Sequence, residues 1–246
     1  ELQTLLRYLG VSDANMEKGE MRVEVNLSIS PDKDVLGTKV EVKNIASFKM
    51  AEKSAAYEIK RHTKLWEDGR QDEIVQETRG WDDVNQKTVS QRSKENSEEY
   101  RYFPDPDLPK LYLHDMFDLG ALKSGLPELP ADKRNRYEKD FGIKTQDIES
   151  YILDMKLGGF FEEVMISLGD NSLAKLASNY VTSDIVGQMV NDESLEYPNA
   201  GLFAKLLKMV NAGDIGSRGA KDLLLRYMKG ETKDPQDLAE AEGLIQ

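Results

Sequence analysis

The clearest pattern in the chain is a strict alternation of apolar and polar side chains in two neighbouring segments. In "MRVEVNLSIS" every second residue from Met21 to Ile29 is apolar, and the residues between them are polar. The segment "TKVEVKN", residues 38–44, alternates in the same way, with Val40 and Val42 on one face. A period of two is typical of a strand with one buried face. The turn-forming sequence "PDKDVLG" lies between the two segments, so we predict an antiparallel hairpin.

A helical pattern follows this hairpin. Ser47 is a suitable N-cap and Gly69 a suitable stop for a helix that begins at Phe48. The helical period predicts one stripe along this helix, formed by Phe48, Ala51, Ala55, Ile59, His62 and Trp66. Because His62 belongs to this stripe, we expect a packed histidine there rather than a catalyst.

Two further segments, residues 73–81 and 86–93, predict a second pair of strands around "DDVN". After about residue 115 the apolar residues recur with a helical period, interrupted by glycines and capping residues. We therefore predict an α+β fold, in which an antiparallel sheet region is followed by an all-α helical region. The glycine pair Gly158-Gly159 is expected to form a hinge between two of these helices.

A proline-rich connector, "EEYRYFPDPDLPKL" at residues 98–111, joins the two regions. Pro104, Pro106 and Pro109 exclude a helix or a central strand, because proline fixes φ and lacks a backbone donor. The segment therefore predicts a rigid extended strut rather than a flexible linker.

The aromatic residues of this connector predict contact with the sheet. Three aromatic side chains within four residues are costly to expose, so we expect Tyr100, Tyr102 and Phe103 to be at least partly buried. Arg101 is expected to reach a carboxylate such as Glu77, or a bound phosphate.

Composition narrows the classes of function. The 246 residues carry a formal net charge of −12, contain no cysteine and include two histidines, His62 and His114. Thiolate chemistry and a soft-metal site are therefore not expected, and any metal would be bound by oxygen atoms, which suits Mg²⁺. No apolar run approaches the length of a membrane span, so we expect no membrane association and a cytoplasmic location, or an organellar matrix in a eukaryote. Both ends of the chain look cut, as in a piece of a longer protein.

The polar face of the predicted hairpin is the strongest candidate for chemistry. Glu24 and Asn26 share that face of one strand, and Glu41 and Lys43 share it on the next. Two carboxylates, an amide and an ammonium group on a rigid sheet could hold Mg²⁺ and a phosphate. Taken from the residues alone, an ordinary solvated face with cross-strand ion pairs is the simpler interpretation.

The second strand pair adds three basic candidates, Arg79, Arg92 and Lys94. Guanidinium groups suit phosphate oxygens. On exposed strands, however, such side chains are usually only solvated, so both interpretations stay open.

One region has a local excess of basic residues. Residues 199–230 contain six basic and two acidic side chains, a local charge of +4 in an acidic chain. Such a region could bind an RNA backbone, or could consist of amphipathic helices with basic outer faces. The candidate RNA-binding residues are Lys205, Lys208, Arg218 and Lys221.

Several motifs together resemble a known family. "LGTKVEVKNIASF", "VQETRGWD", "RSKENSEEYRYFPDPDLPKL" and "LPELPADKRNRY" are similar to the GatB family, the B subunits of the aspartyl/glutamyl-tRNA amidotransferases. The resemblance is dense over the first 130 residues or so and looser afterwards. It implies residues 1–115 as the C-terminal part of an α+β cradle domain, 116–232 as a helical domain and 233–246 as the start of a YqeY-like tail.

The resemblance also implies an activity. The family converts Glu-tRNA(Gln) to Gln-tRNA(Gln), and in many organisms Asp-tRNA(Asn) to Asn-tRNA(Asn). ATP and Mg²⁺ activate the tRNA-bound carboxylate, and ammonia comes through a tunnel from a partner amidase, the A subunit. A small third protein, the C subunit, completes the complex. The expected partners are therefore the A and C subunits, tRNA(Gln) and tRNA(Asn).

Residues of the hairpin match the family's motifs. Glu24 stands where the family usually has Asp, and Glu41 matches the acid of "K-x-E-x-K-N", so the resemblance implies catalytic and metal-binding roles for both. It implies that Lys43 takes part in catalysis, and that Asn26 contacts the cofactor. Ser30 replaces an arginine that is common in the family. The family's N-terminal cradle half and most of its tail are absent, so we expect an incomplete enzyme; the alternative is a non-catalytic tRNA-binding or scaffold module.

Overall fold

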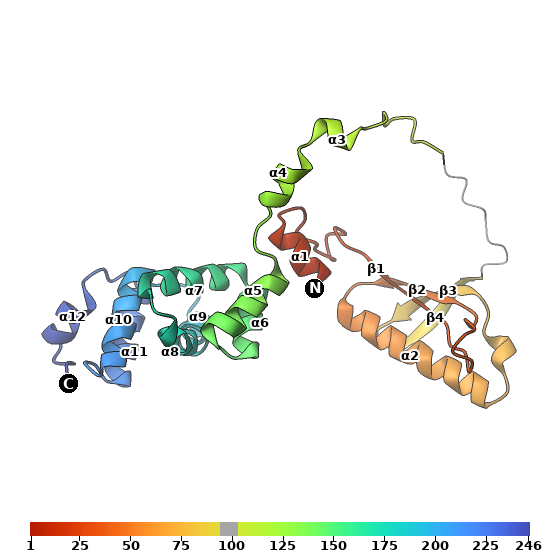
Figure 1. Ribbon diagram of the computed structural model, residues 1–246. Coiled ribbons are helices and arrows are strands. Elements are labelled where there is room, and N and C mark those ends of the chain that lie inside the picture. The colour runs from red at the N-terminus through yellow and green to blue at the C-terminus, as the bar shows by residue number, and fades with distance from the viewer. Residues whose placement is uncertain (94–102) are drawn as a thin grey trace. The chain divides into compact units, whose positions relative to one another are not determined.

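The computed structural model describes residues 1–93 and 103–246, which form two compact units (Figure 1). One unit comprises Gly10–Ser124 and contains the sheet. The other comprises Glu1–Leu9 and Gly125–Gln246 and is built mainly from helices. The α+β fold class is thus confirmed, whereas the finer division into domains at residues 115 and 232 stays a prediction.

In the described part of the chain, four strands form a single sheet in the order β1-β2-β3-β4. The antiparallel pairings of β1 with β2 and of β3 with β4 confirm both predicted strand pairs. β2 and β3 run parallel, so the sheet is mixed rather than antiparallel throughout. The reason is the connection between β2 and β3, because the long helix α2 returns the chain to the end at which β2 began. The strands are β1 (Val23–Leu27), β2 (Val40–Ile45), β3 (Glu77–Asp82) and β4 (Lys87–Ser93).

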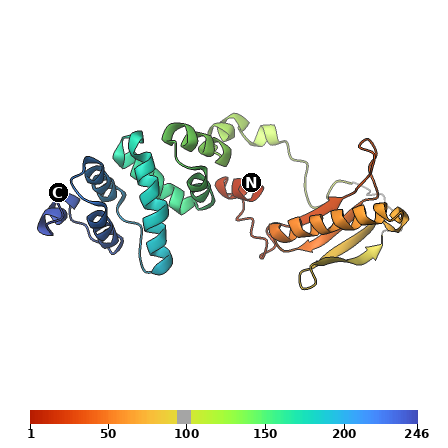
Figure 2. The same ribbon diagram turned by 90° about the horizontal axis from the view of Figure 1, so that it is seen from below.

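Helix α2 (Phe48–Glu67) lies along one face of this sheet (Figure 2). Its start is capped as predicted, since the Ser47 side chain accepts a hydrogen bond from the Met50 backbone N–H at 3.2 Å. Gly69 follows its end with a positive φ of +68°, a conformation that glycine adopts without strain. A short 3₁₀ turn, Gln71–Glu73, then leads into β3.

The buried face of α2 differs from the predicted stripe. Phe48 and Ile59 are 50% and 52% exposed, whereas Ser54, Glu58 and His62 are fully buried. The prediction that the whole stripe faces the core was therefore wrong, although His62 is packed as expected. The helix is rotated in this way because the facing strands present polar side chains that need buried partners.

The helical unit buries an aromatic core. The rings of Tyr151 and Phe161 stack with centroids 4.4 Å apart, and Tyr137 packs against Phe161 edge-on. Tyr8 attaches the N-terminal helix to this unit by donating to the carbonyl of Ile152 at 3.3 Å. The helices are α1 (Leu2–Tyr8), α5 (Pro130–Arg136), α6 (Thr145–Leu153), α7 (Met155–Leu168), α8 (Ala174–Asn179), α9 (Val186–Asn191), α10 (Ala200–Ala212), α11 (Ser217–Met228) and α12 (Pro235–Ala241), with π-helical turns at Tyr137–Phe141 and Tyr180–Ile185 and a 3₁₀ turn at Asn171–Leu173.

The glycine pair predicted as a hinge lies inside α7. Gly158 is buried, and a Cβ atom at this position would lie 2.5 Å from the Tyr151 carbonyl oxygen. The glycine therefore allows α6 and α7 to approach closely, and the hinge prediction was wrong. The backbone of Gly159 belongs to the same continuous helix.

The connector between the regions is exposed where it is described. All residues from 103 to 128 are exposed, including the short helices α3 (Leu113–Met116) and α4 (Leu119–Ser124). Phe103 is 78% exposed, so its predicted burial was wrong. The described part of the chain leaves most of this ring uncovered, and the rigidity of the connector stays a prediction. Tyr100, Arg101 and Tyr102 lie outside the described residues. Among the described helices, none is both long and apolar enough to span a membrane.

Candidate active site

The face of the sheet opposite α2 carries the predicted polar residues. Val40 and Val42 of β2 are fully buried, and strand alternation directs Glu41 and Lys43 to the other face. We call this second surface the open face. In the β1–β2 register Asn26 lies opposite Glu41, so the two strands present their polar residues on the same side.

Three of these side chains form an ion-pair triad. The Nζ atom of Lys43 lies 3.6 Å from Oε1 of Glu24 and 3.5 Å from Oε1 of Glu41. The side chains of Glu24 and Lys43 are more than two-fifths exposed, whereas that of Glu41 is only 12% exposed. The structure thus brings together all four hairpin residues predicted from the sequence, counting Asn26 on the neighbouring strand.

Strand β3 adds a residue that the sequence analysis missed. Thr78 lies beside Glu41 in the parallel β2–β3 register, and its hydroxyl donates to Oε2 of Glu41 at 3.3 Å. Gly80 lies beside Lys43 in the same register. A Cβ atom at Gly80 would lie 2.2 Å from Nε2 of Gln91, so the glycine leaves room for this amide above the strand. The signals for these residues were the predicted strand and the motif "VQETRGWD", which contains both of them.

Arg79, predicted to bind the cofactor, points to the opposite side of the sheet. Its Nε atom lies 3.2 Å from Oε1 of Glu58 and donates to the Thr88 hydroxyl at 2.9 Å. Its guanidinium group also pairs with Glu77. The structure therefore does not bring Arg79 together with Lys43, and instead places it in a polar cluster beneath α2.

Glu58 is the centre of this buried cluster. Its carboxylate is fully buried and lies 2.6 Å from Nη2 of Arg61 and 3.2 Å from Nε2 of His62. Burial alone would raise the pKa of Glu58, but hydrogen bonds from His62, Arg61 and Thr88 outweigh it and lower the pKa to about 2. Glu58 is therefore a carboxylate whose charge the surrounding donors hold in place. Nδ1 of His62 is buried without a hydrogen-bond partner in the described part of the chain.

The remaining two basic candidates of the sheet are only partly located. The backbone of Arg92 lies opposite Thr78 in the β3–β4 register. The Arg92 side chain and the whole of Lys94 lie outside the described residues. Their predicted roles stay predictions.

The open face suits Mg²⁺ in its ligand chemistry. Glu24 and Glu41 offer carboxylate oxygens, the ligands that this cation prefers, and Mg²⁺ is commonly held by one or two carboxylates together with water and phosphate. Two carboxylates beside one ammonium group leave an excess of one negative charge, which favours a cation. The described residues contain no cluster of three or more metal-binding side chains, so the protein groups present would have to share the ion with water or a substrate.

The basic residues predicted to bind RNA lie on α10 and α11 and are exposed. Two of them have acidic partners that the local sequence window did not include. Lys205 lies 2.5 Å from Asp234, and Lys221 lies 2.6 Å from Asp184. The local charge excess along the sequence is therefore reduced in space.

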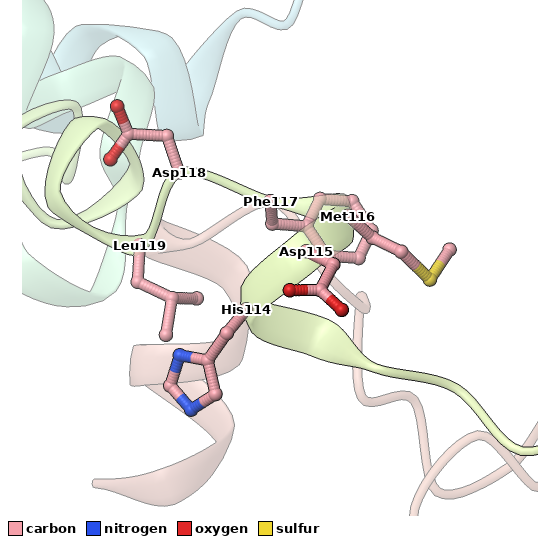
Figure 3. A pocket seen from close by; sticks show the side chains of 6 residues that line it. All are labelled: His114, Asp115, Met116, Phe117, Asp118 and Leu119. Carbon is pink, nitrogen blue, oxygen red and sulfur yellow. The ribbon is translucent and has the colours of Figure 1, made fainter.

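Two shallow hollows are formed by other parts of the chain. The first, of about 450 Å³, is formed by one short stretch of the connector, and Figure 3 shows that its side chains come from adjacent residues: His114, Asp115, Met116, Phe117, Asp118 and Leu119. The second, of about 510 Å³, lies where α7 and α10 begin, beside the stacked rings of Phe160 and Tyr197. Neither hollow is lined by a described residue that was predicted to act in catalysis.

Comparisons with known proteins identify the class. A family model described as "GatB/GatE catalytic domain" matches residues 1–117, and one described as "GatB domain" matches residues 159–246. Curated relatives that are named as the B subunit of aspartyl/glutamyl-tRNA(Asn/Gln) amidotransferase include those of Pelagibacter ubique and Prochlorococcus marinus. The former is 37% identical over 251 residues and the latter 39% over 250 residues.

These matches define the class, since the relatives are named as the B subunit of a tRNA amidotransferase. The chain belongs to the GatB family, as its sequence motifs indicate. The alignments cover 100% and 99% of this chain but only 50% and 49% of the two relatives. The chain therefore spans about half the length of the curated relatives it matches.

Proposed function

We propose that this chain contributes to the amide-forming site of a glutamine-dependent tRNA amidotransferase. In this proposal, ATP activates the carboxylate of Glu or Asp on a mischarged tRNA, and ammonia from a partner amidase then forms the amide. The observation that carries the proposal is the triad on the open face, in which Lys43 lies within 3.6 Å of both Glu24 and Glu41. Its position within the match to the family's catalytic domain supports it further.

Each residue of the triad has a distinct role in this proposal. Glu24 and Glu41 hold Mg²⁺, which would supply charge neutralisation at the phosphates of ATP. Lys43 is a compact cation that suits phosphate oxygens, and its partly exposed ammonium group is accessible to a ligand. Asn26, opposite Glu41, can donate from its amide to a phosphate or to the substrate carboxylate.

The partners follow from the same proposal. The relatives are named as B subunits, which supports an assembly with other chains. We propose an amidase, the A subunit, as the ammonia source, a small C subunit, and tRNA(Gln) or tRNA(Asn) as the carrier of the substrate. The products would be Gln-tRNA(Gln) and Asn-tRNA(Asn), which makes the complex a ligase that forms a carbon–nitrogen bond.

The alternative is a non-catalytic tRNA-binding or scaffold module. Such a module would have no use for two carboxylates and an ammonium group held together on a sheet. The ion pairs of Lys205 with Asp234 and of Lys221 with Asp184 also make the helical unit less basic than the sequence suggested. Both observations favour the catalytic proposal.

The test is Glu41→Gln in the assembled complex. Loss of a metal ligand is expected to lower ATP-dependent transamidation at least ~10²-fold. Glutaminase activity should survive, because it belongs to the partner amidase. Glu17→Gln, at an exposed turn before β1, is the matched control. Near-normal transamidation by Glu41→Gln would reject the assignment and favour the scaffold alternative.

A further inference from the structure

We infer that Thr78 is a positioning residue for Glu41. Its hydroxyl donates from β3 to this carboxylate, at 3.3 Å from Oε2. Thr78 is 8% exposed, and the Glu41 side chain is 12% exposed, so water has little access to the contact between them. This inference rests on the proposed function, because it concerns the orientation in which Glu41 would bind Mg²⁺.

The two oxygens of Glu41 have different partners. Lys43 lies 3.5 Å from Oε1, whereas Thr78 donates to Oε2. If Lys43 turns to a phosphate, its hold on Oε1 is lost, but the hydrogen bond from Thr78 remains. A glutamate has three side-chain torsions, and a donor fixed to the sheet restricts the carboxylate to the orientation required for metal binding.

Thr78 is itself held from the other face of the sheet. The residues on either side of it in β3, Glu77 and Arg79, point beneath α2 and pair with each other. Arg79 also binds Glu58 and Thr88. These contacts anchor the backbone of β3, and a β-branched side chain has little freedom about χ1. The buried cluster beneath α2 therefore helps to fix Thr78 on the open face, because both belong to β3.

The first test separates orientation from mere folding. Thr78→Val removes the hydroxyl at nearly constant volume, and Thr78→Ser restores it. In the assembled complex, Thr78→Val is expected to raise the Mg²⁺ concentration for half-maximal transamidation about tenfold, with glutaminase activity unchanged. Thr78→Ser should stay within about threefold of the wild type. Thr63→Val, at an exposed position of α2, is the control for a threonine-to-valine change.

The second test does not depend on the proposed function. Thermal unfolding of the chain is measured for Thr78→Val, for Glu41→Ala and for the double variant. Thr78→Val is expected to lower the Tm by about 2–4 °C in the wild-type background and to have no effect in the Glu41→Ala background.

The outcomes distinguish failure of the inference about Thr78 from failure of the proposed function. Equal Tm shifts in both backgrounds would show that the hydroxyl does not act on Glu41 and would overturn the inference. Coupled Tm shifts with an unchanged Mg²⁺ requirement in Thr78→Val would also overturn it, because the contact would then be structural only. Coupled Tm shifts with full transamidation by Glu41→Gln would instead reject the proposed function.

Discussion

The carboxylate of Glu58 on α2 lies 3.2 Å from the Nε atom of Arg79 on β3 and joins the helix to the sheet through a buried ion pair. Apolar packing is the usual link between a helix and a sheet, and here a cluster of buried charged groups is added to the packing of Val40 and Val42. Such a pair is costly to bury and stabilises the fold only while all of its partners are present.

Glu58→Gln is therefore expected to lower the free energy of unfolding by about 3–5 kcal/mol, because Arg61 loses its buried counter-charge and Arg79 keeps only that of Glu77. Urea unfolding of the chain, followed by circular dichroism, measures this change. Glu52→Gln is the control on the exposed side of the same helix and should change stability by less than about 0.5 kcal/mol. Equal stability of the two variants would show that the cluster contributes little.

The lowered pKa of Glu58 also predicts that the free energy of unfolding depends on pH in the acid range. The pKa of Glu58 is lowered from the ordinary value of 4.5 to about 2, because donors from His62, Arg61 and Thr88 outweigh the effect of burial. The Glu58 carboxylate therefore binds a proton more readily in the unfolded chain than in the folded one. The stability that its ionised form contributes is fully present above pH 4.5 and is lost as the pH falls from 4.5 to about 2.

Unfolding free energies measured across that window should fall less steeply with acid in Glu58→Gln than in the wild type. Parallel curves for the two proteins would contradict the assignment.

Because the connector is exposed, we expect the stability of the fold to tolerate truncation of the Phe103 side chain. Phe103 is 78% exposed, so Phe103→Ala should change the free energy of unfolding by less than about 0.5 kcal/mol. Phe161 is fully buried in the helical unit, and Phe161→Ala should cost about 3–5 kcal/mol. Comparison of the two melting curves checks this prediction, and a large loss in Phe103→Ala would show that the ring is buried in solution.

Binding of tRNA is expected to depend on the basic residues of α10 and α11 to different degrees. Lys205 and Lys221 each have an aspartate within 2.6 Å, whereas Arg218 is exposed and forms no ion pair with the described residues. Arg218→Gln should therefore weaken tRNA binding more than Lys205→Gln does, and should reduce the salt dependence by about one phosphate contact. Binding isotherms at several salt concentrations test the order, and unchanged affinity in all variants would assign these residues to an ordinary solvated surface.

Much of the candidate site could be predicted from short-range pattern. The alternation around Val40 and Val42 correctly separated the buried face of the hairpin from the face that carries Glu41 and Lys43. The family motifs then indicated which polar residues to examine. The position of Arg79 beneath α2 could not be predicted in this way. Alternation shows which residues of one strand share a face. It does not show whether that face lies on the α2 side of the sheet or on the open face.

The sequence by itself determined the strands, the limits of α2 and the grouping of Glu24, Asn26, Glu41 and Lys43. Each of these depends on local backbone geometry, which repeats every two residues in a strand and every three to four residues in a helix. Only the tertiary structure decided that β2 and β3 run side by side, which puts Thr78 next to Glu41 and Arg79 under α2. It also decided that α2 buries Glu58 rather than Ile59. The physical reason is that a buried charge is stable only where partners from distant segments surround it, and no local pattern records where those partners will lie.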